Sequence, residues 1–304
     1  MLSVRVPGLW LNVQARGVLT GLPRDGGAAV SRGRPCTRAP AGRIGSSGGH
    51  REAALLTLTS RDPLAVTVTE AIRTGDLAGL ERLLADHPAL ATARVTEQSE
   101  DGKGTRTLLH IAADWPGHFP RGAEVVAALV AAGADPRARF EGAHAETPLH
   151  WAASSNDVPV LDALIAAGAD IEASGAVIGG GSPLADARGF GQWRAAHRLI
   201  EHGARVTFQD AATLGLLDRV RAFVEAGEPP SPDEITSAFW GACHGGHLPT
   251  AQYLHRRGAD PHWCGYDGMT PLDIARAQDA DDVVRWLRDL GTQSKACDGA
   301  PHRQ

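Results

Sequence analysis

The chain of 304 residues contains the segment Thr147-Pro148-Leu149-His150-Trp151-Ala152-Ala153, and a second segment, Ala166-Ala167-Gly168-Ala169-Asp170, begins nineteen residues after Thr147. Proline is tolerated in the first turn of a helix, and glycine commonly follows the last turn. The two segments therefore predict a short helix that starts after Thr147 and a second helix that ends near Gly168. Weaker versions of the first segment start at three other positions: Thr107, Ser182 and Thr270.

This pair of segments resembles the ankyrin repeat, whose signature is Thr-Pro-Leu-His-x-Ala at a period of about 33 residues. The resemblance runs from about Thr67 to Gly291, and the chain is similar to bacterial ankyrin repeat proteins of no assigned activity. It implies an all-α fold, a solenoid of about seven helix-turn-helix units with β-turn fingers between them. Glycines mark six expected ends of second helices: Gly133, Gly168, Gly203, Gly227, Gly258 and Gly291.

Several units depart from the signature, and the departures in the first, second and fifth units affect the predicted fold. The first unit keeps only the helical pattern, with Gly75 predicted to end one helix and Asp76 to cap the next. The second unit has an insertion, residues 114–120, whose two prolines cannot lie inside a regular helix. In the fifth unit only 24 residues separate Gly203 from Gly227, which predicts a shortened loop between units.

The ends of the chain differ from its middle in composition. Residues 1–64 are rich in Gly, Arg, Pro and Ser without a sustained period, which predicts a disordered leader. We expect the repeat domain to cover residues 65–293 and a flexible tail to cover residues 294–304. The leader is Arg-rich and poor in acidic residues, which faintly resembles an organelle transit peptide, and a start site assigned too far upstream explains this composition equally well.

The charge distribution excludes some partners. The net charge is -5, but residues 1–51 hold eight Arg and one acid, so the rest of the chain has 22 basic and 34 acidic residues. An acidic body disfavours nucleic acid and an anionic membrane surface as partners. No secretory signal or dense cysteine framework is present, and no apolar run is long enough to span a membrane. We therefore expect a cytoplasmic monomer.

The histidines of the signature are interpreted as structural. His110 and His150 have a side chain that titrates near neutral pH and is common in catalysis. The family resemblance instead implies that this His and the preceding Thr form hydrogen bonds across the turns and connect neighbouring repeats. We expect no catalytic role for either histidine.

The resemblance also implies where a partner would bind. In the family, contacts fall just after the Ala-Ala pair of the first helix and on the fingers between units. Carried over onto this sequence, and with the idiosyncratic residues 114–120 and Trp151 added, the candidate partner-binding residues are Asp114, Trp115, His118, Phe119, Phe140, His144, Trp151, Ser154, Ser155, Phe190, His244 and Tyr266. The leading hypothesis is a non-catalytic protein-protein interaction module that binds an unidentified protein through its concave helix ends and fingers.

Residues 114–120, Asp-Trp-Pro-Gly-His-Phe-Pro, support two alternatives. They either form a functional lip over the groove or pack as a rigid cover on the first repeats. The lip version leads to the alternative function, a small-molecule groove, possibly catalytic, lined by Trp115, His118, Trp151 and Phe190.

Two groups of residues could suggest a zinc site and an acid–base catalytic site, but the sequence supports neither. Cys243, His244, His247, His262 and Cys264 match no specific zinc spacing. An acid–base site built from Asp114, His118, Asp186 and His244 would need these groups within reach of one substrate proton, and no nucleophile elbow, phosphate-binding loop or dinucleotide motif accompanies them. We expect no metal, no cofactor and no enzymatic activity.

Overall fold

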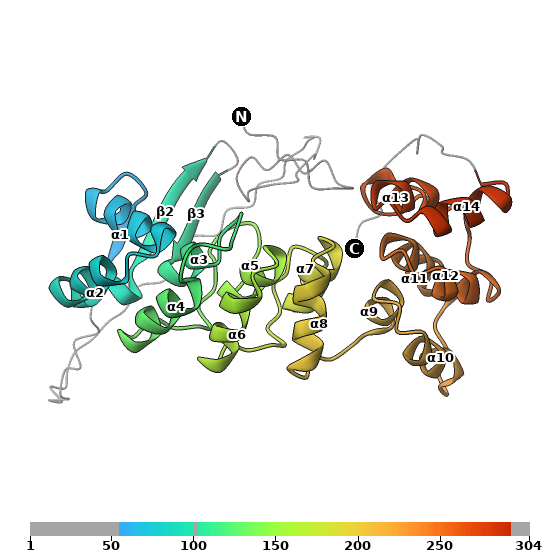
Figure 1. The fold of residues 1–304 in the computed structure, drawn as a ribbon, viewed down its shortest axis with the longest axis horizontal. Coiled ribbons are helices and arrows are strands. Elements are labelled where there is room, and N and C mark those ends of the chain that lie inside the picture. The colour runs from blue at the N-terminus through green and yellow to red at the C-terminus, as the bar shows by residue number, and fades with distance from the viewer. Residues whose placement is uncertain (1–54, 100–101, 293–304) are drawn as a thin grey trace, which may run out of the picture.

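The computed structural model describes residues 55–99 and 102–292. Within these ranges fourteen helices follow one another as seven consecutive pairs, and neighbouring pairs stack side by side (Figure 1). We call the odd-numbered helix of each pair the first helix and the even-numbered one the second helix. The mostly helical stack confirms the predicted repeat fold.

The helix pairs have the following bounds: α1 Pro63–Thr74 and α2 Leu77–Asp86; α3 Leu108–Ala112 and α4 Gly122–Ala131; α5 Pro148–Ser154 and α6 Val158–Ala166; α7 Pro183–Gly189 and α8 Trp193–Glu201; α9 Phe208–Thr213 and α10 Leu217–Glu225; α11 Pro232–His244 and α12 Leu248–His255; α13 Pro271–Ala277 and α14 Asp281–Asp289. Two 3-10 helices, η1 Pro88–Thr92 and η2 Tyr266–Gly268, complete the helical elements of the described chain.

The turn of the first pair forms as predicted. Gly75 ends α1 in the left-handed conformation (φ 70°), and the Asp76 side chain accepts a hydrogen bond from the Gly79 N–H at 2.9 Å. A Cβ at position 75 would lie 2.3 Å from the carbonyl oxygen of Pro120, so only glycine fits here. The close contact also places residues 114–120 against the first pair.

Hydrogen bonds from the signature histidines connect neighbouring pairs. The Thr147 N–H donates to His150 Nδ1 at 3.0 Å, which leaves the ring proton on Nε2 to be donated to the Gly181 carbonyl oxygen at 3.3 Å, just before α7. One pair earlier, His110 Nε2 makes the same contact with the carbonyl oxygen of Glu146 at 3.1 Å. Both rings are fully buried. The structural role predicted for these histidines is confirmed.

A small sheet makes the all-α prediction incomplete. Strands β1 Thr57–Thr59, β2 Arg94–Ser99 and β3 Gly102–Thr107 form a sheet in that order, with β1 parallel to β2 and β2 antiparallel to β3. Leu58 and Val95 turn inward and join the core of the first helix pairs. The antiparallel hairpin occupies the connection between α2 and α3, where a repeat resemblance predicts only a finger.

The predicted domain ends fall partly outside the described residues. The leader was placed at residues 1–64, of which residues 1–54 lie outside the described ranges, while β1 and the start of α1 fall within its last ten residues. The predicted tail, residues 294–304, lies outside them entirely.

The hydrophobic core is divided into two clusters that meet at α9. The first cluster extends from Leu58 to Ala204 and includes Leu214, and the second runs from Ala211 to Leu287. Six residues connect α8 to α9 and another six connect α10 to α11, whereas sixteen connect α6 to α7. The fifth pair therefore lacks a long finger on either side, as the spacing of its glycines predicts.

The stack bends at this fifth pair. In Figure 1 the pairs from α1 to α8 form a row, and the pairs from α9 to α14 turn away from it, so that α7 and α8 face α11 to α14 across the inside of the bend. An ion pair crosses the joint, with Arg188 Nε on α7 2.7 Å from Asp210 Oδ1 on α9. Their side chains are only 14% and 5% exposed, so this ion pair is largely shielded from water.

None of the helices in the described ranges combines the length and apolarity that a membrane crossing requires.

Candidate binding surface

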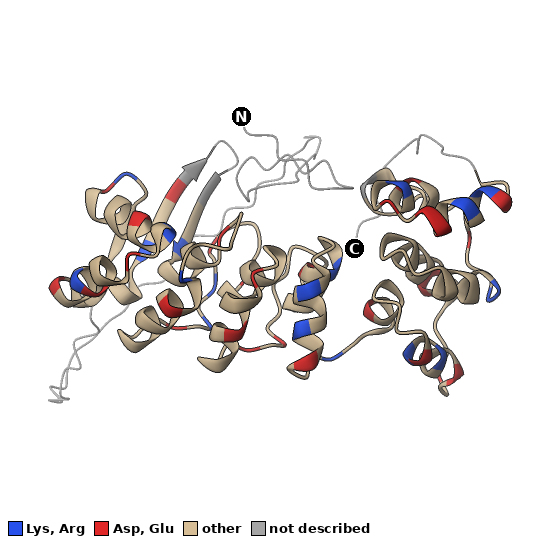
Figure 2. Ribbon diagram, in the orientation of Figure 1, with Lys and Arg blue, Asp and Glu red and all other residues tan. Residues whose placement is uncertain are grey.

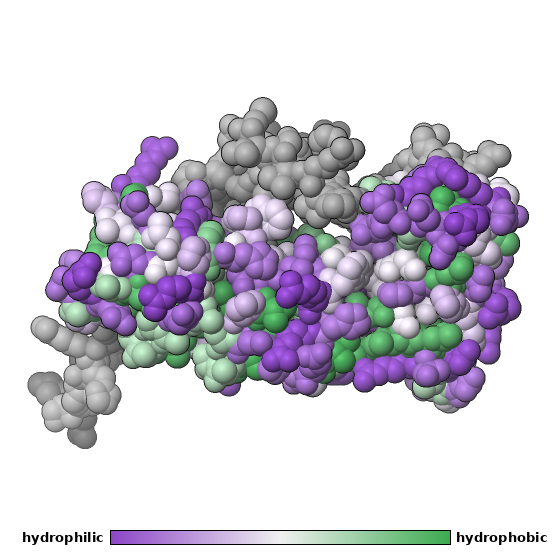
Figure 3. Space-filling model, viewed as in Figure 1, coloured by the Kyte–Doolittle hydropathy of each residue, from purple (hydrophilic) through white to green (hydrophobic). Residues whose placement is uncertain are grey.

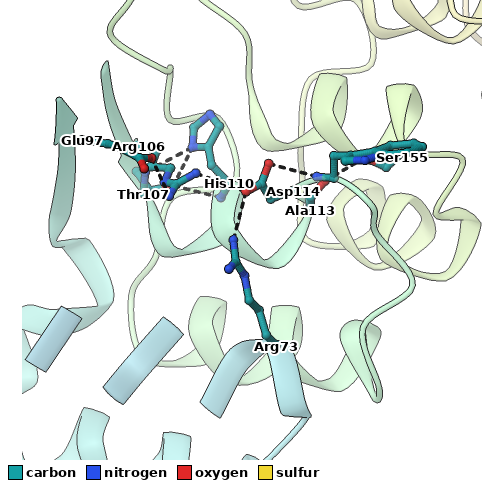
Figure 4. Close-up of polar contacts among 9 residues, drawn as sticks. Arg73, Glu97, Arg106, Thr107, His110, Ala113, Asp114 and Ser155 are labelled. Carbon is teal, nitrogen blue, oxygen red and sulfur yellow. Dashed lines mark hydrogen bonds and ion pairs between the residues drawn. The ribbon is translucent and has the colours of Figure 1, made fainter. Parts of the chain in front are cut away.

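Asp114 anchors the loop of residues 114–120 by charge. Its Oδ2 atom lies 3.3 Å from an Arg73 nitrogen on α1 and 3.1 Å from Arg106 Nη1 on β3 (Figure 4). Arg106 also pairs with Glu97 on β2 at 3.0 Å. The Asp114 side chain is 14% exposed. Its carboxylate thus connects the first helix pair, the sheet and the loop, and is mostly used by the fold itself.

The rest of the loop packs against its neighbours on both sides. On the α5 side, the Ser155 hydroxyl donates to the Ala113 carbonyl oxygen at 3.3 Å, and the His118 N–H donates to the Asp157 carboxylate. On the α1 side, the Arg73 guanidinium lies 5.9 Å from the centre of the Phe119 ring. These contacts favour the packing interpretation of the loop over an open lip. Trp115 and Phe119 are nonetheless half-buried and His118 is exposed, so the loop keeps an accessible surface.

Four of the candidate residues are in the interior. Trp151 is 2% exposed, Ser154 4%, Ser155 2% and His244 3%. The position after the Ala-Ala pair ends a short helix that the next pair covers, so side chains there face the stack. We therefore remove these four from the surface available to a protein partner. Because Trp151 is buried, the alternative groove under residues 114–120 loses one of its four expected lining residues.

The finger before α5 presents one exposed candidate and one half-buried one. His144 is exposed. Phe140 is half-buried, with its ring centre 5.5 Å from that of Trp151 and 6.4 Å from that of His110. Arg139 fixes the finger by donating hydrogen bonds to the carbonyl oxygens of Ala145 and Ser174. The finger is therefore a rigid element with His144 at its surface.

Tyr266 is the most accessible aromatic candidate. It lies on the finger before α13 and is 37% exposed. Its hydroxyl lies 3.2 Å from Ser237 Oγ, and its ring packs edge-on against Trp240 with 5.2 Å between ring centres. Trp263 contacts it from the other side at 5.9 Å. The side chain is thus held in one position while more than a third of its surface faces solvent.

An aromatic line that sequence reasoning missed crosses α11. Trp193, at the start of α8, contacts His244 at 5.2 Å between ring centres, and His244 contacts Trp240 at 5.4 Å. Trp240 continues the line to Tyr266. The line begins where first helices end and finishes at the finger before α13. Trp193 was not predicted as a site residue because it does not lie at a signature position. Its contact with His244 exists because the bend places the fourth helix pair beside the sixth.

Trp240 takes the place of a signature histidine. The left-handed residue after α11 is Gly246 and the one after α5 is Asn156, and counting six residues back from each gives Trp240 and His150. Trp240 Nε1 donates to the carbonyl oxygen of Met269 at 2.9 Å, just before α13, which is the contact His150 makes to the residue before α7.

Trp240→Phe is expected to lower the free energy of unfolding by about 0.5–1.5 kcal/mol, because one hydrogen bond to the Met269 carbonyl oxygen is lost, while that oxygen keeps its bond from the Gly265 N–H at 2.9 Å and the ring contacts remain. The measurement is the urea midpoint. Trp286→Phe is the matched control, since Trp286 makes ring contacts and no hydrogen bond is recorded for its indole in the described ranges. Equal losses in the two variants would show that the indole bond of Trp240 contributes nothing.

Phe190, Asp186 and Cys243, which the sequence analysis also considered, lie in separate places and make separate contacts. Phe190 is half-buried at the end of α7. Asp186 is buried and accepts a hydrogen bond from the Ile178 N–H at 3.1 Å. No group of three or more His, Cys, Asp or Glu side chains in the described residues could hold a metal ion. Cys243 is buried in the core, and this burial raises the pKa of its thiol.

Comparison with known families identifies two of the pairs. Residues 106–140 match a family model described as Ankyrin repeat, and residues 144–173 match a second model with the same description. The matches cover the second and third helix pairs. No curated protein matches the chain.

Proposed function

We propose that the chain, which is an ankyrin repeat protein, is a non-catalytic module that binds one protein partner through the finger side of its first helices. Ankyrin repeats are generally protein-protein interaction modules. On this proposal all seven helix pairs, from Pro63 of α1 to Asp289 of α14, are ankyrin units of one domain in a monomeric cytoplasmic protein, and the predicted disordered leader extends no further than residue 54.

The observation that carries the proposal is that Tyr266 is exposed and at the same time held in one orientation. Tyrosine is enriched among the residues that dominate binding energy at protein interfaces. A side chain that is already ordered loses little conformational entropy when a partner covers it. Tyr266 meets both conditions, because its hydroxyl and ring are held by Ser237 and Trp240 while 37% of its surface is exposed.

The first helices have two rims, a finger rim on which the proposed surface lies and an opposite rim. Fingers precede the first helices and the loops of each pair follow them, so the two sets of connections lie at opposite ends of these helices. His144 lies on the finger rim with Tyr266, and Phe140 is half-buried beside it. Asp114, Trp115, His118, Phe119 and Phe190 belong to the opposite rim. Of these, Asp114 positions the loop through its ion pairs rather than contacting the partner.

The test begins with affinity capture. The full chain is used as bait in an extract of its source cell, and the retained proteins are identified by mass spectrometry. The dissociation constant of a retained protein is then measured for the purified chain, for Tyr266→Ala and His144→Ala, and for Leu290→Ala as control. Leu290 is 39% exposed, close to the value for Tyr266, but lies at the end of the last second helix.

The expected result is a loss of affinity of about tenfold or more for Tyr266→Ala, because truncating such a residue at the centre of an interface costs about 2 kcal/mol or more. Leu290→Ala should change the affinity by less than about twofold. If Tyr266→Ala binds as tightly as the unchanged chain, the finger side is not the interface.

A further inference from the structure

The junction between the fourth and fifth helix pairs lacks a side-chain donor that other junctions have. At four junctions a side chain of the first helix forms a hydrogen bond to a carbonyl oxygen of the next pair; these side chains are His110, His150, Gln209 and Trp240. In the fourth pair the segment Ser182-Pro183-Leu184-Ala185 aligns with Thr147-Pro148-Leu149-His150, so Ala185 takes the position of the histidine. An alanine side chain has no polar atom, and the fourth pair is therefore connected to the fifth without this bond.

An ion pair takes the place of the missing bond. Arg188 Nε on α7 lies 2.7 Å from Asp210 Oδ1 on α9, and both side chains are largely shielded from water. In Figure 2 the basic residues (blue) of α7 and α8 lie across from the acidic residue (red) of α9. A buried ion pair adds little net stability compared with apolar side chains of similar size, because both charges lose their hydration. The contact therefore specifies how the two pairs meet more than it stabilises the meeting.

Apolar packing across this junction is also sparse. Helix α9 packs extensively against α11 but meets α7 at only a few residues, and α8 and α10 barely touch, whereas α4 and α6 pack closely. Among the buried residues described after Ala204, only Leu214 belongs to the first core cluster. The N-terminal half of the stack, α1 to α8, and the C-terminal half, α9 to α14, therefore share little core.

The connection into the fifth pair is short and little covered. Elsewhere the fingers brace successive pairs, as when Arg139 before α5 donates a hydrogen bond to the Ser174 carbonyl oxygen before α7. Between α8 and α9, the Arg205 N–H donates to the Glu172 carboxylate at 2.7 Å, which holds the connection to the N-terminal half as far as Arg205. Val206 follows and is half-buried, and Figure 3 shows hydrophobic residues (green) at the surface of this part of the molecule.

The inside of the bend has room for movement. A pocket of about 380 Å³ lies beside Trp193, between this residue of the N-terminal half and residues 244–246 and 278–282 of the C-terminal half. Trp193 meets His244 edge-on, with 5.2 Å between ring centres, at one side of this space. Because the pocket is not filled by side chains, a rotation that narrows the bend can move into open space.

We propose that the fifth pair is a hinge with its pivot at Val206, and that the Arg188–Asp210 ion pair is the latch that holds the bend. Protein hinges are typically a few residues at the ends of secondary-structure elements. Val206 is such a residue, because it directly precedes Thr207, whose N–H donates to the Asp210 carboxylate at 2.9 Å. This bond joins the latch to the start of α9, so α9 moves with the C-terminal half when the latch opens. The hinge goes beyond the protein-binding surface and does not depend on it.

The test measures distances between pairs of nitroxide labels in the full chain by double electron–electron resonance. The labels are attached to p-acetylphenylalanine at exposed helix positions, so that the native cysteines stay unmodified. One label pair, Arg194 and Asp289, spans the joint. Two reference pairs lie within one half each: Glu124 with Arg194, and Asp218 with Asp289.

Two double variants are compared with the unchanged chain. Arg188→Met, Asp210→Asn opens the latch and removes both charges together, so that neither is left buried alone. Arg198→Met, Asp162→Asn is the matched control, because it removes an ion pair of the same residue types and the same 2.7 Å separation between α8 and α6, inside the N-terminal half.

In the unchanged chain the three distance distributions should have similar widths. The latch variant should widen the distribution across the joint about twofold or more, as hinge motion requires, and leave both reference distributions unchanged. Unchanged reference distributions also show that both halves remain folded. The control variant should change none of the three.

Four results would overturn the proposal. If the latch variant leaves the distribution across the joint unchanged, or if this distribution is already twice as wide as the others in the unchanged chain, the ion pair is not the latch. Equal widening of all three distributions shows that the whole stack has loosened, so the fifth pair is not a hinge. Widening across the joint in the control variant as well shows that the effect does not come from the Arg188–Asp210 pair.

Discussion

Asp210→Asn is expected to lower the free energy of unfolding by about 3–5 kcal/mol, because removing one partner of a buried ion pair leaves the other charge uncompensated. The charge left behind is the Arg188 guanidinium, whose side chain is 14% exposed. Asp210 also accepts hydrogen bonds from the N–H and hydroxyl of Thr207 at the start of α9. Asparagine retains an oxygen for these bonds, so the loss reports mainly on the charge. The measurement is urea unfolding followed by circular dichroism.

The matched control is an ion pair of the same residue types on the surface. Arg198 Nε lies 2.7 Å from Asp162 Oδ1, with side chains 38% and 35% exposed. Asp162→Asn should cost less than about 1 kcal/mol, because solvent screens exposed pairs. The double variant Arg188→Met, Asp210→Asn should recover most of the loss, since it removes both charges. If Asp210→Asn costs no more than Asp162→Asn, the Arg188–Asp210 pair does not hold the joint.

Acidification is expected to destabilise the protein between pH 6.5 and pH 4 through its buried histidines. Burial lowers the pKa of His150 from 6.5 to about 4. Below pH 6.5 the unfolded chain binds a proton that the folded chain refuses, so the free energy of unfolding falls as the pH falls, until the folded state is protonated near pH 4. The full effect is about 3 kcal/mol for this residue, since one pKa unit corresponds to about 1.4 kcal/mol. His244 adds a loss of the same sign in the same window.

The measurement compares urea midpoints at pH 7.5 and pH 5, a range above the ordinary carboxylate pKa values, in which about 2 kcal/mol of the His150 effect appears. His150→Gln is the control, because it retains an N–H that can reach Gly181 and removes the titrating group. The variant should lose less stability than the unchanged chain over this range. In addition, the imidazole signals of His150 and His244 should not shift in NMR spectra over it. A normal titration of either ring would contradict its burial.

The repeat framework was predictable from sequence because its signals are local. A threonine, a proline and a histidine within four residues define a helix start and the hydrogen bond to the next pair, as His150 and Gly181 show. Gly75 and Asp76 define a helix end and start in the same way. The short fifth unit followed from the spacing of Gly203 and Gly227 alone.

The binding surface was less predictable because it depends on what neighbouring pairs cover. Ser155 and His244 hold positions that the family resemblance assigns to binding, yet both are buried by contacts with other units. The three-residue strand β1 has no sequence pattern of its own and exists through pairing with β2. The pocket beside Trp193 needs the bend at α9, which brings the fourth pair to the sixth and seventh, and no local pattern specifies that angle.

Because the core is divided into two clusters, the described chain consists of two packed halves, which we call arms, joined at α9, which we call the elbow. Within each arm every pair is locked to the next by a continuous apolar cluster, so relative motion is concentrated where the clusters meet, at α9. Trp193 belongs to one arm, and His244 and Gln278 belong to the other. A small rotation at the elbow therefore widens or narrows the space between them and leaves distances inside each arm unchanged. A change in the angle between the arms would therefore change the distance between Trp193 and His244, whose ring centres lie 5.2 Å apart.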